Sequence, residues 1–102
     1  MQIRETRRDQ TAQLALEGRF DFNSHRDFRG AYDGLLGDPQ VRVIELNFAK
    51  VDYLDSSALG MLLLLREKVE ASGKSIVLSG LQGTVKQVLE IANFQRLFTI
   101  SD

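Results

Sequence analysis

The chain has 102 residues, of which 43% are hydrophobic and 26% are charged, a composition typical of one globular domain and not of a disordered chain. Thirteen basic and fourteen acidic side chains give a net charge of −1, which argues against a nucleic-acid partner. The absence of cysteine excludes disulfides, thiol catalysis, cysteine-ligated zinc fingers and iron–sulfur clusters.

The N-terminal segment 1–10 lacks the apolar core of a signal peptide. The longest apolar run, Met61–Leu65, is far too short to span a membrane. Charges of both signs are mixed along Arg4–Asp9, so we interpret this run as a solvated strand edge or turn and not as a basic patch. We therefore expect one domain over 1–102, located in the cytoplasm, with no membrane insertion.

Two strands and a helix are predicted in the first part of the chain. A short strand is expected over Ile3–Arg7, and a better alternating strand over Thr11–Gly18, which Gly18 ends. The apolar period then becomes helical, and one stripe is formed by four residues: Phe28, Ala31, Tyr32 and Leu35.

Short polar residues mark both ends of this helix. Asn23 or Ser24 can cap its start, and Asp27 lies three residues after Ser24, as in a capping box. Gly37 and the pair Asp38-Pro39 stop it.

The second part of the chain is predicted to contain, in order, a strand, a loop, a helix, a strand, a helix and a short strand: Val41–Phe48, 49–55, Ser56–Ala71, Lys74–Gly80, Thr84–Phe94 and Leu97–Ile100. The first of these strands is β-branched and nearly continuous in its apolar content, which predicts burial on both faces. Thr84 with Gln87 fits a capping box.

This alternation predicts an α/β fold with a mixed, mostly parallel central sheet of four to five strands and about three helices. The crossovers between parallel strands should be right-handed.

Sequence patterns of enzymes are hard to find. His25 is the single histidine and lies near a helix start, where a solvated side chain is more common than a base. The glycines form no phosphate-cradling loop, and no G-x-S-x-G surrounds the serines. Asp52 and Asp55 could bind a hard cation, but two carboxylates make a weak metal site. We predict no enzyme activity, no cofactor and no metal.

The segment VDYLDSSALGMLLLLREK, Val51–Lys68, carries the functional question. Ser56 and Ser57 stand where a loop turns into a helix, so they can be caps or modifiable hydroxyls. Both interpretations hold together if Asp55 caps the helix and a serine stays free.

The helix after these serines has more leucine than one buried face needs. At 100° per residue, one face is formed by Ala58, Leu59, Leu62, Leu65 and Val69, with Met61 at its margin. Gly60, Leu63 and Leu64 point away from that face. These surplus residues are either an exposed apolar patch for a protein partner or are covered by a neighbouring element.

The ordered series LEGRFDF, VRVIELNF, VDYLDSSALGMLLLL and GKSIVLSGLQGTVKQVLEIANFQRLFTI resembles the STAS domain of bacterial anti-sigma factor antagonists. The resemblance runs from about Leu14 to Ile100. Its most specific element is Asp55-Ser56-Ser57-Ala58-Leu59, which is similar to the family's D-S-[ST]-[GA]-[LI] loop. Gly18, Asp21 and the turn Ser79–Leu81 match more weakly.

This resemblance implies a STAS-like domain without catalysis of its own. It also implies that a partner kinase, often the anti-sigma factor itself, phosphorylates the serine after the loop aspartate, here Ser56, and that a Ser/Thr phosphatase removes the phosphate. Ser57 aligns with the neighbour that is not usually the acceptor, and Ala58 replaces the commoner glycine. Asp21, Asp52, Asp55 and Ser57 would support the loop. The partner surface would comprise Ala58, Gly60, Met61, Leu63 and Leu64.

Two other functions stay open at the level of sequence. Some STAS-like domains are scaffold subunits that dock to a transporter ATPase or to another signalling enzyme. A small enzyme of unrecognised type is the third class, and it would show turnover or a metal held by Asp52 and Asp55. The sequence names neither the partner nor the phosphorylation state that is active.

Overall fold

The structure of the protein is a computed structural model, which describes residues 1–101. Eight main elements follow one another in the order β1 (Gln2–Arg8), β2 (Thr11–Phe20), α1 (His25–Leu36), β3 (Val43–Leu54), α2 (Ser56–Ala71), β4 (Ser75–Ser79), α3 (Gly83–Ile91) and β5 (Thr99–Ser101). Two short 3₁₀ turns, η1 (Phe22–Ser24) and η2 (Phe94–Arg96), precede α1 and β5. The predicted order of strands and helices is confirmed.

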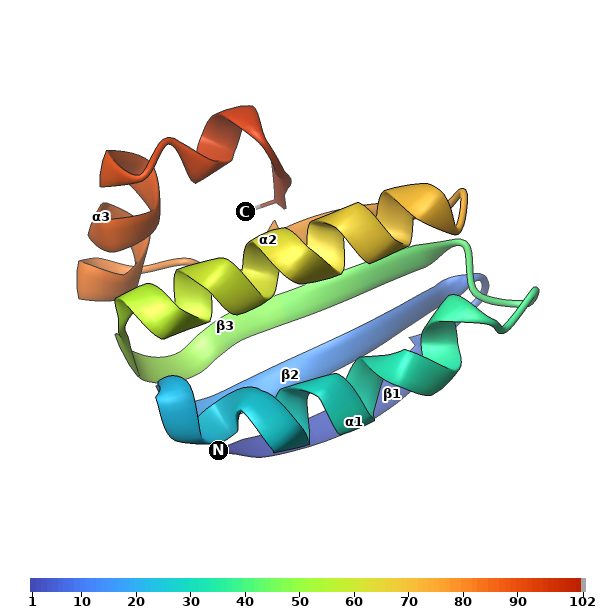
Figure 1. The fold of residues 1–102 in the computed structure, drawn as a ribbon, viewed down its shortest axis with the longest axis horizontal. Coiled ribbons are helices and arrows are strands. Elements are labelled where there is room, and N and C mark those ends of the chain that lie inside the picture. The colour runs from blue at the N-terminus through green and yellow to red at the C-terminus, as the bar shows by residue number, and fades with distance from the viewer. Residues whose placement is uncertain (102) are drawn as a thin grey trace.

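The five strands form one mixed sheet in the order β1-β2-β3-β4-β5. β1 runs antiparallel to β2, with Ile3 opposite Leu16, and the other three pairings are parallel. In Figure 1, α1 and α2 lie across the same face of this sheet, while α3 lies at one end of it. The prediction of a mostly parallel sheet with three helices is therefore correct.

The core fills the space between the sheet and the helices. Alternate residues of β2 and β3 point toward the helices and are fully buried, among them Leu14, Leu16, Ile44 and Leu46. Each such side chain contributes about 1.5–3 kcal/mol through removal of its surface from water. At one end of this layer, the rings of Phe20 and Phe28 join β2 to α1, with centroids 4.9 Å apart.

β3 differs from its prediction in length and in burial. It runs on to Leu54, so the loop expected over 49–55 is mostly strand. β2 continues in parallel beside it, with Glu17 opposite Lys50 and Phe20 opposite Leu54. Burial alternates over residues 43–48 of β3, because helices cover one face of the sheet while the other face is half-buried and mostly polar. From Ala49 on, two exposed residues precede each buried one. The expected burial on both faces is therefore wrong.

Three boundary signals were also assigned to the wrong places. Gly18 does not end β2 but lies inside it with a φ of +97°, beside a register shift that bends the strand. The capping box near α1 is formed one turn earlier than predicted, by Asp21 and Ser24 around η1. The expected Thr84–Gln87 box is not formed, because α3 begins at Gly83 with Gln82 as its N-cap.

Candidate functional site

Two strand ends and one helix start meet at one end of the sheet (Figure 1). The last residues of β2 and β3, Phe20 and Leu54, are register partners. The next residue, Asp55, donates its backbone N–H to the Phe20 carbonyl at 3.3 Å. The chain then enters α2 at Ser56 and, on the β2 side, enters η1 at Phe22. The parallel pairing of β2 and β3 thus places Asp21 and Asp55 side by side.

Asp55 caps α2 with its side chain. Its Oδ1 accepts the N–H of Ala58 at 3.0 Å, and its Oδ2 accepts the N–H of Phe22 at 3.3 Å. The first bond satisfies a donor at the helix start, as expected of an N-cap aspartate. The second bond joins the helix start to the loop after β2. Of the caps that the sequence left open, Asp55 is therefore the one found.

The two serines after Asp55 differ in exposure. Ser56 is the first residue of α2 and is exposed, and no hydrogen bond to its hydroxyl is found within residues 1–101. Ser57 is half-buried. Ser56 therefore presents a free hydroxyl at the positive end of a helix dipole.

Asp21 holds the loop beside the serines. Its Oδ1 accepts the N–H of Asn23 at 3.0 Å, and its Oδ2 lies 3.5 Å from Nε of Arg19. Ser24, which is 1% exposed, accepts the N–H of Asp21 at 3.1 Å and donates its hydroxyl to the Arg19 carbonyl at 3.0 Å. This network fixes the backbone on both sides of Phe22.

The remaining predicted chemical residues lie apart from this network. Asp52 is part of β3 and is exposed, and His25 begins α1 and is exposed. Within residues 1–101, no group of three or more His, Cys, Asp or Glu side chains is arranged to hold a metal ion. None of the helices in that range is both long and apolar enough to cross a membrane.

The predicted partner surface on α2 is only partly at the surface. Leu63 and Leu64 are 39% and 40% exposed, and Gly60 is exposed as well. Ala58 and Met61 are 0% and 7% exposed, so both belong to the core and the prediction that they offer contact surface is wrong.

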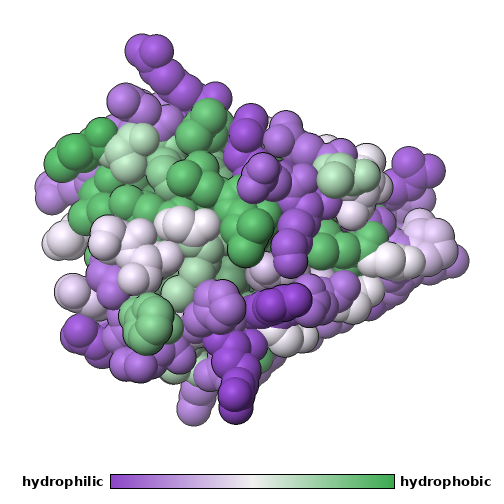
Figure 2. Space-filling model, viewed as in Figure 1, coloured by the Kyte–Doolittle hydropathy of each residue, from purple (hydrophilic) through white to green (hydrophobic). Residues whose placement is uncertain are grey.

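α2 makes contacts on more of its circumference than the one stripe that faces the sheet. The chain after α3 folds back over it, and Arg66 of α2 donates to the Leu97 carbonyl at 2.6 Å. Figure 2 shows hydrophobic surface gathered over α2, over α3 and over the segment that follows α3. Leu97, also 40% exposed, belongs to this side of the molecule.

Sequence reasoning missed two exposed aromatic residues. Phe22 is 73% exposed and lies directly after Asp21, and Tyr53 is 41% exposed near the end of β3. The guanidinium of Arg19 lies 3.9 Å from the Tyr53 ring centroid. The sequence did contain a signal for Phe22, because an apolar residue between the capping Asp21 and the polar pair Asn23-Ser24 is expected to lie in an exposed turn. The Arg19–Tyr53 contact depends on strand register, which the sequence did not reveal.

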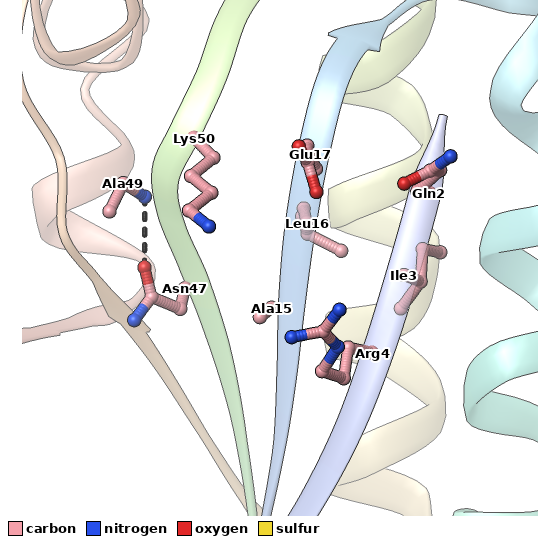
Figure 3. A pocket seen from close by; sticks show the side chains of 9 residues that line it. All are labelled: Gln2, Ile3, Arg4, Ala15, Leu16, Glu17, Asn47, Ala49 and Lys50. Carbon is pink, nitrogen blue, oxygen red and sulfur yellow. Dashed lines mark hydrogen bonds between the residues drawn. The ribbon is translucent and has the colours of Figure 1, made fainter.

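A hollow of about 420 Å³ lies on the face of the sheet that α1 and α2 leave open (Figure 3). The small side chain of Ala15 leaves space there, and the side chains of Arg4, Glu17 and Lys50 stand around it. The side-chain oxygen of Asn47 accepts the N–H of Ala49 at 2.8 Å at its margin. This hollow is lined by β1, β2 and β3 and includes none of the residues of the serine loop.

Comparison with known proteins agrees with this geometry. Residues 3–99 match the family model described as "Mlab, STAS domain". The chain belongs to the STAS domain family. The STAS-domain containing protein PA14_20770 of Pseudomonas aeruginosa (strain UCBPP-PA14) is 46% identical over 88 residues, which cover 86% of this chain and 85% of that protein.

Solved structures share the STAS fold at low sequence identity. The putative anti-sigma factor antagonist TM1081 of Thermotoga maritima has a TM-score of 0.87 at 22% identity, covering 98% of this chain and 86% of that one. The anti-sigma factor antagonist SpoIIAA, unphosphorylated, has a TM-score of 0.76 at 22% identity, covering 99% and 88%. The phosphorylated Bacillus form of SpoIIAA has a TM-score of 0.74 at 19% identity, covering 99% and 92%. These similarities show that the chain also has the fold of the family.

Proposed function

We propose that this STAS domain is a phospho-regulated interaction module, an anti-sigma factor antagonist in a bacterial partner-switching pathway, with Ser56 as its phosphorylation site. The observation that carries the proposal is the division of roles at the start of α2. Asp55 caps the helix, so the exposed Ser56 hydroxyl is not needed to hold the fold. The likeness in fold to SpoIIAA, solved in both unphosphorylated and phosphorylated forms, supports phosphorylation as the means of regulation.

A phosphate at Ser56 would change charge more than structure. It adds about −1.5 to −2 charges and three acceptor oxygens. At a helix N-terminus it gains about 0.3–1 kcal/mol from the dipole and the free N–H groups, so the fold should survive. The carboxylates of Asp52 and Asp55 make the modified surface strongly negative. A partner that packs on Leu63 and Leu64 would have to desolvate this charge, which is costly.

The proposed partners follow from this role. A serine kinase, which can be the anti-sigma factor itself, would phosphorylate Ser56 in the cytoplasm, and a Ser/Thr phosphatase would remove the phosphate. The bare form would bind the anti-sigma factor. Another signalling protein could occupy the same surface, and the STAS domain itself would carry out no catalysis.

The test compares three variants of the tagged chain in its own cells. Ser56→Ala should abolish phosphate incorporation, measured by intact mass, while it retains the partner in a pull-down read by mass spectrometry. Ser56→Asp should recover the partner less well. Ser57→Ala is the matched control, because it removes the neighbouring hydroxyl, and it should still be phosphorylated.

The same experiment separates the alternatives. Phosphate on the Ser56→Ala chain would show that the site is wrong. A transporter ATPase recovered equally by all three variants, with no kinase, would indicate a scaffold subunit instead. The thermal unfolding midpoint of Ser56→Asp should match or slightly exceed that of the unmodified chain. Such a result would show that this variant binds less well for a reason other than unfolding.

A further inference from the structure

Phe22 combines high exposure with a fixed backbone. Its ring is 73% exposed, and its N–H is bonded to Asp55 Oδ2 at 3.3 Å. The residues on both sides are held by the Asp21 and Ser24 side chains, through the N–H of Asn23 at 3.0 Å and the N–H of Asp21 at 3.1 Å. A single exposed apolar residue is ordinary, but here a polar network fixes the backbone that carries the ring.

The same backbone is tied to the residue before Ser56. Asp55 donates to the Phe20 carbonyl at 3.3 Å and accepts from Phe22 N–H at 3.3 Å, so it brackets the loop on both sides of Asp21. Its other carboxylate oxygen holds the Ala58 N–H at 3.0 Å. Any displacement of the Asp55 carboxylate therefore removes the acceptor of Phe22.

A phosphate on Ser56 would act directly on that carboxylate. The phosphoryl dianion would stand one residue after Asp55 and would compete for the free N–H groups of the first turn of α2. The two neighbouring anions repel each other, which displaces the Asp55 carboxylate from its present position. The acceptor of the Phe22 N–H is then weakened or lost.

We propose that Phe22 is the aromatic anchor through which the partner protein distinguishes bare from phosphorylated Ser56, an inference that rests on the proposed function. The partner is a protein with an apolar pocket that receives the phenyl ring while its rim covers the Ser56 hydroxyl. In the bare form, Asp55 holds the ring in the position that fits this pocket. Phosphorylation places charge at the rim and releases the ring from its backbone support. An aromatic side chain buried in such a pocket is a common centre of binding energy.

The first test needs only this chain. Phosphoserine is incorporated at position 56 during synthesis, and amide proton shifts and exchange rates are compared with those of the bare chain by NMR. The Phe22 amide proton should move upfield and exchange several-fold faster. The Asn23 amide, which is bonded to Asp21 and not to Asp55, is the internal control and should change much less. An unchanged Phe22 amide would overturn the inference.

The second test measures binding of the purified protein that the Ser56→Ala chain recovers in its pull-down. Phe22→Ala should weaken binding by about tenfold or more, the usual effect of removing an aromatic anchor. Ile91→Ala removes a side chain of similar exposure, 82%, on α3 and should leave binding unchanged. Circular dichroism checks that both variants are folded.

The two proposals fail in different ways. If Ser56→Asp weakens binding but Phe22→Ala does not, phosphoregulation stands and the anchor role of Phe22 is wrong. If Ser56→Asp binds as well as the bare chain, the proposed function itself is wrong, and with it the anchor.

Discussion

Asp55 accepts the backbone N–H of Phe22, 33 residues earlier in the chain, with one carboxylate oxygen and caps α2 with the other. One short side chain thus connects a strand-to-helix loop of β2 to the start of the helix that follows β3. The residue next to the proposed phosphorylation site therefore has two structural partners, and both are backbone donors. The capping role could be predicted from local sequence, whereas the link to Phe22 requires the parallel pairing of β2 with β3.

Asp55→Ala should destabilise the chain by about 0.5–2 kcal/mol, because the Ala58 N–H loses its side-chain acceptor and Ala is a poor N-cap. Urea denaturation followed by circular dichroism measures the change. Asp52→Ala is the matched control, since it removes an exposed carboxylate three residues earlier. The control should stay within about 0.5 kcal/mol of the parent chain. Equal decreases in the free energy of unfolding for both variants would show that loss of a negative charge, and not loss of the helix cap, is responsible.

The sequence predicted elements whose signals are local. The α2 bounds follow from Asp55 at its start and the apolar period along it, and they are as predicted. The β-branched run from Val41 indicated a strand, but not its continuation to Leu54. That continuation depends on pairing with β2, which keeps β3 as its partner through two register shifts, near Ala15 and Gly18, up to Phe20 opposite Leu54. Pairing between strands carries no local signal, so the strand end was interpreted as a loop.

Burial around α2 shows a second limit. One helical stripe describes packing against one surface, but α2 contacts the sheet and is also bonded through Arg66 to the chain after α3. Met61 lies on the side of α2 that carries Lys68, whose Nζ is 5.7 Å from the Tyr32 ring centroid of α1, and it is buried although it lies at the margin of the predicted stripe. Leu59 lies on the Arg66 side and is only partly buried. Leu63 and Leu64 are 39% and 40% exposed, which decides between the exposed patch and the covered face that the sequence left open.

Met61→Ala and Leu64→Ala should separate stability from binding on this one helix. Met61 is 7% exposed, so its truncation should cost about 2–5 kcal/mol. Leu64 is 40% exposed, and its truncation should cost well under half of that. Binding to the partner recovered by the Ser56→Ala chain should instead be weakened by Leu64→Ala. If Leu64→Ala binds normally, the apolar contact surface does not include the exposed side of α2.

The ion pair between Arg7 and Asp38 gives the chain a defined acid response. Arg7 Nη1 lies 2.8 Å from Asp38 Oδ2. This bond is the main reason that the pKa of Asp38 lies below its ordinary value of 3.8, and the hydrogen bond from the N–H of Gln40 is the second. A carboxyl with a lowered pKa stabilises the folded chain above the ordinary value. That contribution is lost as the pH falls through the folded pKa.

Arg7→Ala should therefore raise the pKa of Asp38 toward 3.8, without restoring it fully, because the Gln40 N–H remains bonded to the carboxylate. An NMR titration of the Asp38 carboxyl carbon measures the shift. Arg8→Ala, one residue further along β1, should leave this pKa in place. An Asp38 pKa that is the same in all three chains would contradict the role assigned to Arg7.

Gly80 occupies a backbone position that side chains rarely adopt, with a φ of +68° directly after β4. A Cβ added there would lie 2.7 Å from Asn47 Oδ1 and 2.9 Å from the Ala49 nitrogen, the two atoms joined by the bond drawn in Figure 3. Gly80→Ala should thus cost more than the roughly 1–2 kcal/mol of a left-handed residue alone. Gly34 lies inside α1, and a Cβ added there would meet no atom within 4 Å. Gly34→Ala should therefore increase the free energy of unfolding by about 0.5–1 kcal/mol. Urea midpoints that move in the same direction for both variants would show that close approach at β3 is not what requires glycine at this position.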